Sequence, residues 1–164
     1  MIHHKYLNDL RIKSIEPCIF NTAEKDAERD GLFAEERENY GFDSRETWSL
    51  DYTYATWLYS HLKLFYERAH KVVNLEFYKF SIPVLYEIPT EELEYKNNSP
   101  IPEHFFKEIV ETKTQLEAIN LMIEYLKNYL ELENSADLSA DFKKIEYIAC
   151  ATKIFAEVLP AMWW

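Results

Sequence analysis

Glycine is scarce in this sequence, since only Gly31 and Gly41 occur among 164 residues. Glycine supplies the positive φ angles and the close backbone approach that phosphate-binding loops require. Because the two glycines stand apart, the chain can build neither a P-loop nor a dinucleotide-binding fingerprint. The sequence therefore argues against a nucleotide held in a glycine-rich loop, and we predict no cofactor.

Cysteines and long apolar runs are also few. Cys18 and Cys150 are the two cysteines, and they do not form the close-spaced pattern of a zinc site. No apolar run approaches the roughly 20 residues that span a bilayer. The segment Met1–Lys5 leads into polar residues rather than into the apolar stretch of a secretion signal. We therefore expect a cytoplasmic protein with reduced thiols.

Basic residues are outnumbered by acidic ones, 18 against 29, which gives a net charge of −11. Such a surface repels phosphates and anionic lipids, so we expect no direct binding of nucleic acid or membrane, and a basic protein as the partner. Residues 22–46 hold nine acids and four bases. The alternative for this segment is a solvated helix with ion pairs between residues four apart. The predicted partner-binding residues are the acids before Gly41: Glu24, Asp26, Glu28, Asp30, Glu35, Glu36 and Glu38.

Motifs for catalysis are missing as well. The sequence has no nucleophile elbow and no cysteine–histidine nucleophile signature. Glu67 and His70 have the three-residue spacing of half a di-iron site, but no second such pair exists. Asp51 lies among aromatic residues, where a buried carboxylate needs a hydrogen-bond partner, so a structural role is favoured over a catalytic one. We predict no catalytic residue, no metal site and no enzyme activity.

Helix signals dominate the rest of the chain. A capping box at Asn21–Glu24 predicts a helix to about residue 39 with Gly41 as its stop, and a second one at Asp43–Glu46 predicts a long aromatic helix to about His70. Further helices are predicted over 102–133 and 139–159. The apolar stripe expected on the last helix is Ile145, Ile148, Thr152, Phe155 and Leu159.

Residues 72–100 interrupt the helical pattern. Val72–Phe77 alternates as a short strand does, and Pro83, Pro89 and Pro100 divide the rest of the segment. The predicted fold is mainly all-α, an irregular helical bundle around a central aromatic-rich helix, with a loop-rich or short-strand insertion near 72–100. We predict one acidic helical domain over 1–164, consisting of an acidic extension (1–40) and a helical core (41–164).

The segment Gly41–Asp51, together with Leu62–Phe65, resembles a segment of many small uncharacterised phage and prophage proteins. Those sequences read glycine, aromatic, a few polar residues and then acid-x-Trp-x-Leu-Asp before an apolar helix. The closing helix, with Lys143-Lys144-Ile145 and Phe155-Ala156, is similar to theirs. The resemblance covers about residues 41–70 and 115–164. It implies a helical fold and a viral origin in a bacterial host, and it carries no agreed activity.

Three functional hypotheses fit these observations. The first is a non-enzymatic acidic binding protein that inhibits a host nucleic-acid-handling or defence system, such as a CRISPR effector, because carboxylates can pair with the lysines and arginines that hold phosphates. The second is a structural or housekeeping phage protein that self-associates into a homo-oligomer through its aromatic tail, Ala161–Trp164. The third is a helical enzyme or small-ligand binder with a polar pocket near Asp51 and Glu67.

Overall fold

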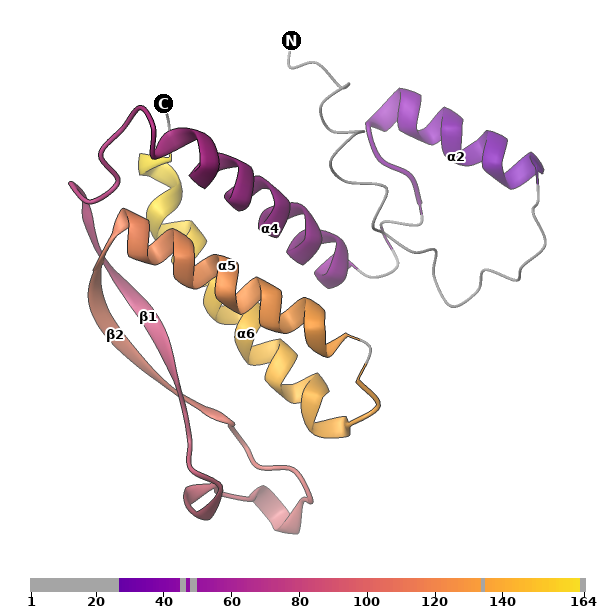
Figure 1. Cartoon of the computed structure of the whole chain (residues 1–164). Coiled ribbons are helices and arrows are strands. Elements are labelled where there is room, and N and C mark those ends of the chain that lie inside the picture. The colour runs from indigo at the N-terminus through magenta and orange to yellow at the C-terminus, as the bar shows by residue number, and fades with distance from the viewer. Residues whose placement is uncertain (1–26, 45–46, 48–49, 134, 163–164) are drawn as a thin grey trace. The chain divides into compact units, whose positions relative to one another are not determined.

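The computed structural model describes residues 27–44, 47, 50–133 and 135–162, with the backbone alone for 27–30 (Figure 1). The chain divides into two compact units, Met1–Ser60 and His61–Trp164. The boundary falls within helix α4 (Leu50–Ala69). Each unit is described by itself. The predicted division into an extension over 1–40 and a core over 41–164 stays a prediction.

The first unit contains helix α2 (Ala27–Tyr40) and the first half of α4. Helix α2 ends where Gly41 adopts a φ of 79°, and the Gly41 N–H donates to the Arg37 carbonyl at 2.9 Å. The predicted helix stop at Gly41 is thus confirmed. Two residues later, the buried carboxylate of Asp43 forms an ion pair with the Arg37 guanidinium, which ties the following turn to the end of the helix.

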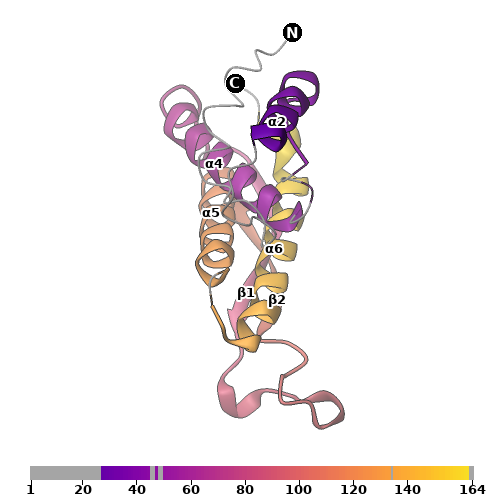
Figure 2. The same ribbon diagram turned by 90° about the vertical axis from the view of Figure 1, so that its right-hand side faces the viewer.

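The second unit combines a β-hairpin with a helical hairpin. Strands β1 (Lys79–Glu87) and β2 (Phe106–Thr114) pair antiparallel, with Val84 opposite Ile109. The connection over 88–105 contains two short 3₁₀ turns, η1 (Thr90–Glu92) and η2 (Lys96–Asn98). Helices α5 (Gln115–Leu132) and α6 (Leu138–Val158) lie side by side along the strands, and turn η3 (Leu159–Ala161) comes after α6 (Figures 1 and 2).

Buried apolar side chains hold the second unit together. On α5 they recur every three or four residues, as an amphipathic helix requires. Those with less than 5% exposure on α5 are Ala118, Ile119, Met122, Tyr125, Leu126 and Tyr129. Cys150, Ala151, Ile154 and Val158 form the corresponding stripe of α6, and Ile82 of β1 is fully buried. The helices therefore present one face each to the core of this unit.

The predicted helix over 102–133 is wrong in its first third. Residues Phe106–Thr114 form β2, and the helix begins only at Gln115. The segment Val110–Thr114 alternates β-branched and charged residues, which suits a strand with one exposed edge. Thr114 then caps α5: its Oγ accepts from the Glu117 N–H at 3.2 Å while Glu117 accepts from the Thr114 N–H at 2.7 Å. This capping box marks the true start of the helix.

The strand in the insertion lies later than predicted. Residues 72–77 form turns, and β1 begins at Lys79. Pro83, which we expected to divide the segment, sits inside β1. It is tolerated because its carbonyl points away from β2, toward the Cys150 thiol at 3.6 Å, so at this residue the ladder needs no N–H.

A mainly helical chain with a strand insertion is thus confirmed at that level. Its arrangement as a bundle around the long aromatic helix stays a prediction. The last helix is confirmed within one residue at each end, since α6 runs from Leu138 to Val158. Its predicted stripe is wrong, because Ile145 and Leu159 are 62% and 52% exposed while Cys150 and Ile154 are buried.

Candidate protein-binding site

The predicted acidic arm is only partly within the described residues. Glu24 and Asp26 lie outside them, and Glu28 and Asp30 are placed on α2 by backbone alone. Glu35 and Glu38 are exposed on α2. Glu36 is half-buried, and its carboxylate accepts a hydrogen bond from the Ser44 N–H at 2.7 Å, so this acid helps to hold the turn after α2.

The other acids singled out in the sequence are not gathered into a site. Asp51 is exposed in the first turn of α4, so the burial that its structural role assumed does not occur. Glu67 and His70 are exposed near the end of α4, and the His70 ring stacks on Tyr66 with centroids 5.2 Å apart. Within the described part of the chain, no group of three or more histidine, cysteine or acidic residues is placed to hold a metal ion.

The hairpin connection carries a second set of acids that sequence reasoning did not single out. Glu91, Glu92 and Glu94 lie in it, the first two in turn η1 and the third just after it. Among the described residues, their carboxylates make no ion pair and no hydrogen bond. Some other acids of this unit are paired with lysines: Glu108 binds Lys153 at 2.7 Å, and Glu133 binds Lys144 at 2.9 Å. Uncompensated negative charge is therefore concentrated at this end of the hairpin.

Two of these acids, Glu92 and Glu94, border a groove of about 400 Å³. Ile88 and Phe106 supply its apolar surface, and Lys107 is its one lysine. The full lining is Ile88, Glu92, Glu94, Glu103, His104, Phe106 and Lys107. An apolar floor with carboxylates at the rim suits a lysine or arginine side chain, because the methylene stem packs on the floor while the charged head reaches the rim.

Hydrogen bonds to the backbone position the groove. The Glu103 N–H donates to the Glu94 carbonyl at 2.9 Å, and the Lys96 ammonium binds the Glu103 carboxylate at 2.9 Å, so the two sides of the connection are joined. The Lys96 pair lowers the pKa of Glu103, mainly through that hydrogen bond. The connection extends beyond the ends of α5 and α6, where a partner has access to it (Figure 2).

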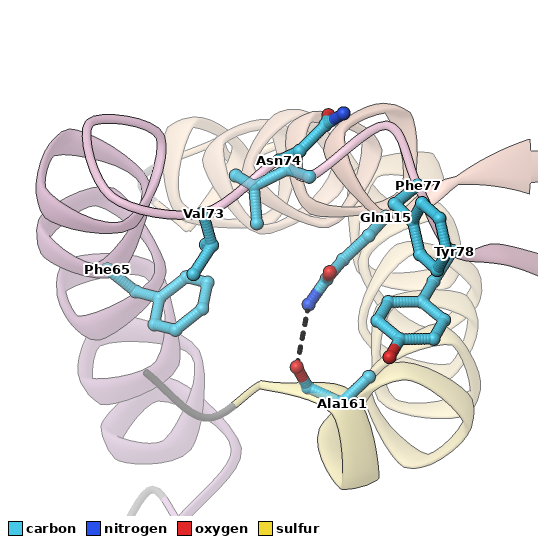
Figure 3. A pocket seen from close by; sticks show the side chains of 8 residues that line it. Phe65, Val73, Asn74, Phe77, Tyr78, Gln115 and Ala161 are labelled. Atoms are coloured by element: carbon cyan, nitrogen blue, oxygen red, sulfur yellow. Dashed lines mark hydrogen bonds between the residues drawn. The ribbon is translucent and has the colours of Figure 1, made fainter.

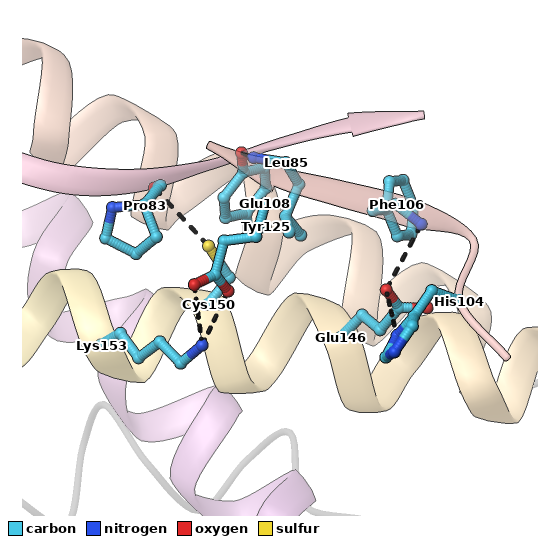
Figure 4. A network of polar contacts seen from close by, with 9 residues as sticks. All are labelled: Pro83, Leu85, His104, Phe106, Glu108, Tyr125, Glu146, Cys150 and Lys153. Carbon is cyan, nitrogen blue, oxygen red and sulfur yellow. Dashed lines mark hydrogen bonds and ion pairs between the residues drawn. The ribbon is translucent and has the colours of Figure 1, made fainter. Parts of the chain in front are cut away.

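Glu146 of α6 fixes the strand end beneath the groove. Its carboxylate accepts from the backbone N–H of Phe105 at 2.8 Å. It also accepts from the backbone N–H of Phe106 at 3.3 Å (Figure 4). The His104 ring lies 3.6 Å from the same carboxylate. The Phe106 ring packs against Tyr147 of α6 with centroids 4.8 Å apart. The floor of the groove is thereby attached to the helical hairpin.

A second cavity, of about 300 Å³, lies at the opposite end of the strands (Figure 3). Its walls include Phe65, Val73 and Tyr78, and the Gln115 side chain donates to the Ala161 carbonyl at 3.0 Å across it. Neither cavity is lined by Asp51 or Glu67, the acids around which a polar ligand pocket was predicted. Trp163 and Trp164 of the predicted aromatic tail lie outside the described residues.

Comparison with known proteins gives no family for this chain: no protein-family model, no curated protein and no solved structure matches it. The phage-family resemblance therefore stays a prediction. No helix in the described ranges has both the length and the apolar composition that a bilayer crossing needs.

Proposed function

We propose that this protein is a non-enzymatic binding domain that takes a basic segment of a protein partner in the acidic groove at the end of the β1–β2 hairpin. The observation that carries the proposal is the group of carboxylates of Glu91, Glu92 and Glu94, which have no counter-ion in the described structure. In the same unit, Glu108 and Glu133 are paired with lysines.

The groove supports this proposal more strongly than the acids alone. Carboxylates on an open helix attract cations only weakly in salt, because the interaction is screened within about 8 Å at physiological ionic strength. Beside an apolar floor such as Ile88 and Phe106, the same carboxylates meet a partially desolvated cation. A short basic segment gains both ion pairing and burial of its methylene groups there.

The partner class that fits best is a nucleic-acid-handling enzyme, whose phosphate channel offers clustered lysines and arginines. A protein with a net charge of −11 is steered toward such a channel over long range and competes there with the phosphates. The finer proposal is thus an inhibitor of phage or prophage origin acting on a host system of this kind, for which a CRISPR effector is one candidate.

A peptide titration tests the binding mode. The protein is titrated into a fluorescent Arg/Lys-rich peptide, and the fluorescence anisotropy of the peptide is measured at a series of NaCl concentrations. A length-matched Ser/Gln peptide is the control. Binding is expected for the basic peptide alone and is expected to weaken as salt rises. Failure to bind either this peptide or any basic nucleic-acid enzyme at low ionic strength contradicts the proposal.

Charge-matched variants locate the site. The variant Glu91→Gln/Glu92→Gln/Glu94→Gln removes two negative charges from the groove and a third from the adjoining turn η1. The control Glu35→Gln/Glu38→Gln/Glu157→Gln removes three charges from other exposed positions, so both variants have the same net charge. Loss of binding in the first variant alone supports the groove. Loss in the control alone moves the site out of the groove, either to the acids of α2, as the sequence predicted, or to Glu157 of α6.

A further inference from the structure

The outer edge of strand β2, the edge that faces away from β1, carries backbone groups that lack hydrogen-bond partners in the described structure. The Leu85 N–H donates to the Tyr125 hydroxyl, and the Pro83 carbonyl accepts from Cys150, so at these residues the β1 backbone points away from β2 (Figure 4). Their partners in the antiparallel register are Glu108 and Val110. Backbone groups of such non-hydrogen-bonded pairs point outward on both strands. Glu108, Val110 and Thr112 therefore direct their N–H and C=O groups away from β1.

The ends of this edge are closed and its middle is open. The outward N–H of Phe106 is taken by Glu146, and that of Thr114 by Glu117. Between them lies Val110, which is 68% exposed, and Glu108 and Thr112 are exposed as well. In the described part of the chain no acceptor is found for the backbone N–H groups of these three residues. An open strand edge of this kind is a template for another strand.

We infer that the open β2 edge pairs with the β2 edge of a second copy of this chain, antiparallel about a two-fold axis at Val110. In this register Val110 faces Val110 of the second copy, and Glu108 faces Thr112. All three open N–H groups of each copy then meet a carbonyl. A shift of two residues in either direction brings Phe106 or Thr114 into the ladder, where the N–H is already bound to a glutamate. The centred register is the one that satisfies every open group.

The local charge of β2 also favours a second copy of this chain as the partner over a strand with a net negative or net positive charge. The chain carries −11, yet β2 is locally neutral, with Lys107 and Lys113 balanced by Glu108 and Glu111. The Glu108 and Glu111 carboxylates are already paired with Lys153 and Lys113. Near the axis the contacting side chains are Val110 and the 39%-exposed Ile109. Lys107 faces Lys113 of the second copy at the ladder ends, where solvent screens the pair.

The proposed dimer does not depend on the acidic groove, and the salt dependence of association distinguishes the two proposals. Pairing of two copies that each carry −11 is expected to strengthen as ionic strength rises, because salt screens their repulsion, whereas binding of a basic segment weakens. A single strand pair buries little surface, so we expect a weak dimer. Over protein concentrations from about 1 µM to 1 mM, the dimer is expected to be populated only toward the upper end.

The test is sedimentation equilibrium of the whole chain in about 0.5 M NaCl, which screens the repulsion between copies. Native hydrogen exchange is measured on the same samples. The wild-type is expected to dimerise and to slow amide exchange at Glu108, Val110 and Thr112 only at dimer-forming concentrations. Val110→Lys places like charges across the axis, and Val110→Pro removes the axial N–H. Each is expected to lower the association constant about tenfold or more, while Val110→Thr, which keeps both shape and N–H, is expected to dimerise.

Circular dichroism checks that each variant is folded, and the lysine variant decides the test if the proline variant is not. A wild-type that stays monomeric throughout overturns the inference. So does a dimer that neither Val110→Lys nor Val110→Pro weakens, or protection of the three amides that appears only when a different protein is added.

Discussion

The backbone N–H of Leu85 in strand β1 donates a hydrogen bond to the hydroxyl of Tyr125 on helix α5, 2.7 Å away. This N–H lies on the side of β1 that β2 does not cover, so the tyrosine supplies the acceptor that a third strand otherwise would. The Tyr125 side chain is 4% exposed, and its ring packs near Tyr147. Tyr125 thus satisfies an outward N–H in the middle of the β1 edge, whereas the corresponding N–H groups of β2 stay open.

Tyr125→Phe is expected to destabilise the second unit while leaving its packing unchanged. Removing the hydroxyl leaves the Leu85 N–H without a partner in a half-buried position, which costs about 1–3 kcal/mol of unfolding free energy. Urea denaturation followed by circular dichroism measures the difference. Tyr95→Phe at an exposed position is the control and is expected to change stability by less than about 0.5 kcal/mol. Equal stability of both variants contradicts the assigned role of the hydroxyl.

Glu146→Ala is expected to loosen the floor of the acidic groove. The carboxylate receives the N–H groups of Phe105 and Phe106, so its loss leaves two backbone donors unsatisfied and costs about 2–3 kcal/mol. Hydrogen exchange at these two amides is expected to accelerate. Glu146→Gln keeps one acceptor oxygen and is expected to lose about half as much stability. If exchange at Phe105 and Phe106 is unchanged in the alanine variant, the glutamate does not fix this strand end.

Thr114→Ala is expected to weaken the junction between β2 and α5. It removes the N-cap oxygen that binds the Glu117 N–H, a loss of about 1 kcal/mol. The Thr114 N–H and hydroxyl lower the pKa of Glu117, so stability from this pair is present at neutral pH and is lost as pH falls through that lowered pKa. The control is Thr152→Ala inside α6, whose hydroxyl binds its own helix at Ile148; it is expected to be neutral or stabilising. A pH-independent difference between Thr114→Ala and wild-type contradicts the linkage to Glu117.

The elements that could be predicted from the sequence are those whose signals are local. Gly41 stops α2 because only its positive φ matters there, and the last helix is predicted within one residue. Which face of that helix is buried is not predictable, because Ile145 and Ile154 are equally apolar and only the packed hairpin selects the second. Strand β2 is predicted as helix because its partner β1 lies about 25 residues earlier, beyond the reach of a pattern read in short windows.

The candidate site could not be predicted for a similar reason. The acids of 22–46 stand out because they are dense in the sequence. Glu92 and Glu103 line the same groove only because the turns of the hairpin connection bring them together. A signal is nevertheless present: three acids occur between Pro89 and Lys96 without a neighbouring base. Density in the chain therefore identifies acidic segments, while only the fold distinguishes paired carboxylates from free ones.

Cys150 is expected to be unreactive in the folded protein, and its titration gives a stability change of known sign. Burial raises the pKa of its thiol from an ordinary value of 9.0 to about 12. At pH 8 the thiolate fraction is then about 10⁻⁴, so reaction with a disulfide reagent is expected to be slow until the chain unfolds. The Cys18→Ser background isolates the signal, and the same protein in guanidinium is the positive control.

The stability from Cys150 is expected to depend on pH at the alkaline end. Because the folded thiol keeps its proton above pH 9 while the unfolded one loses it, this contribution is complete below about pH 9 and is lost as pH rises toward about 12. Burial likewise raises the pKa of Tyr125, which adds to the same trend. Two outcomes contradict the buried placement of Cys150 against Pro83. One is rapid labelling of the native protein at about pH 8. The other is an unfolding free energy that rises between about pH 9 and 11, the range that lies between the ordinary and the raised pKa of the thiol.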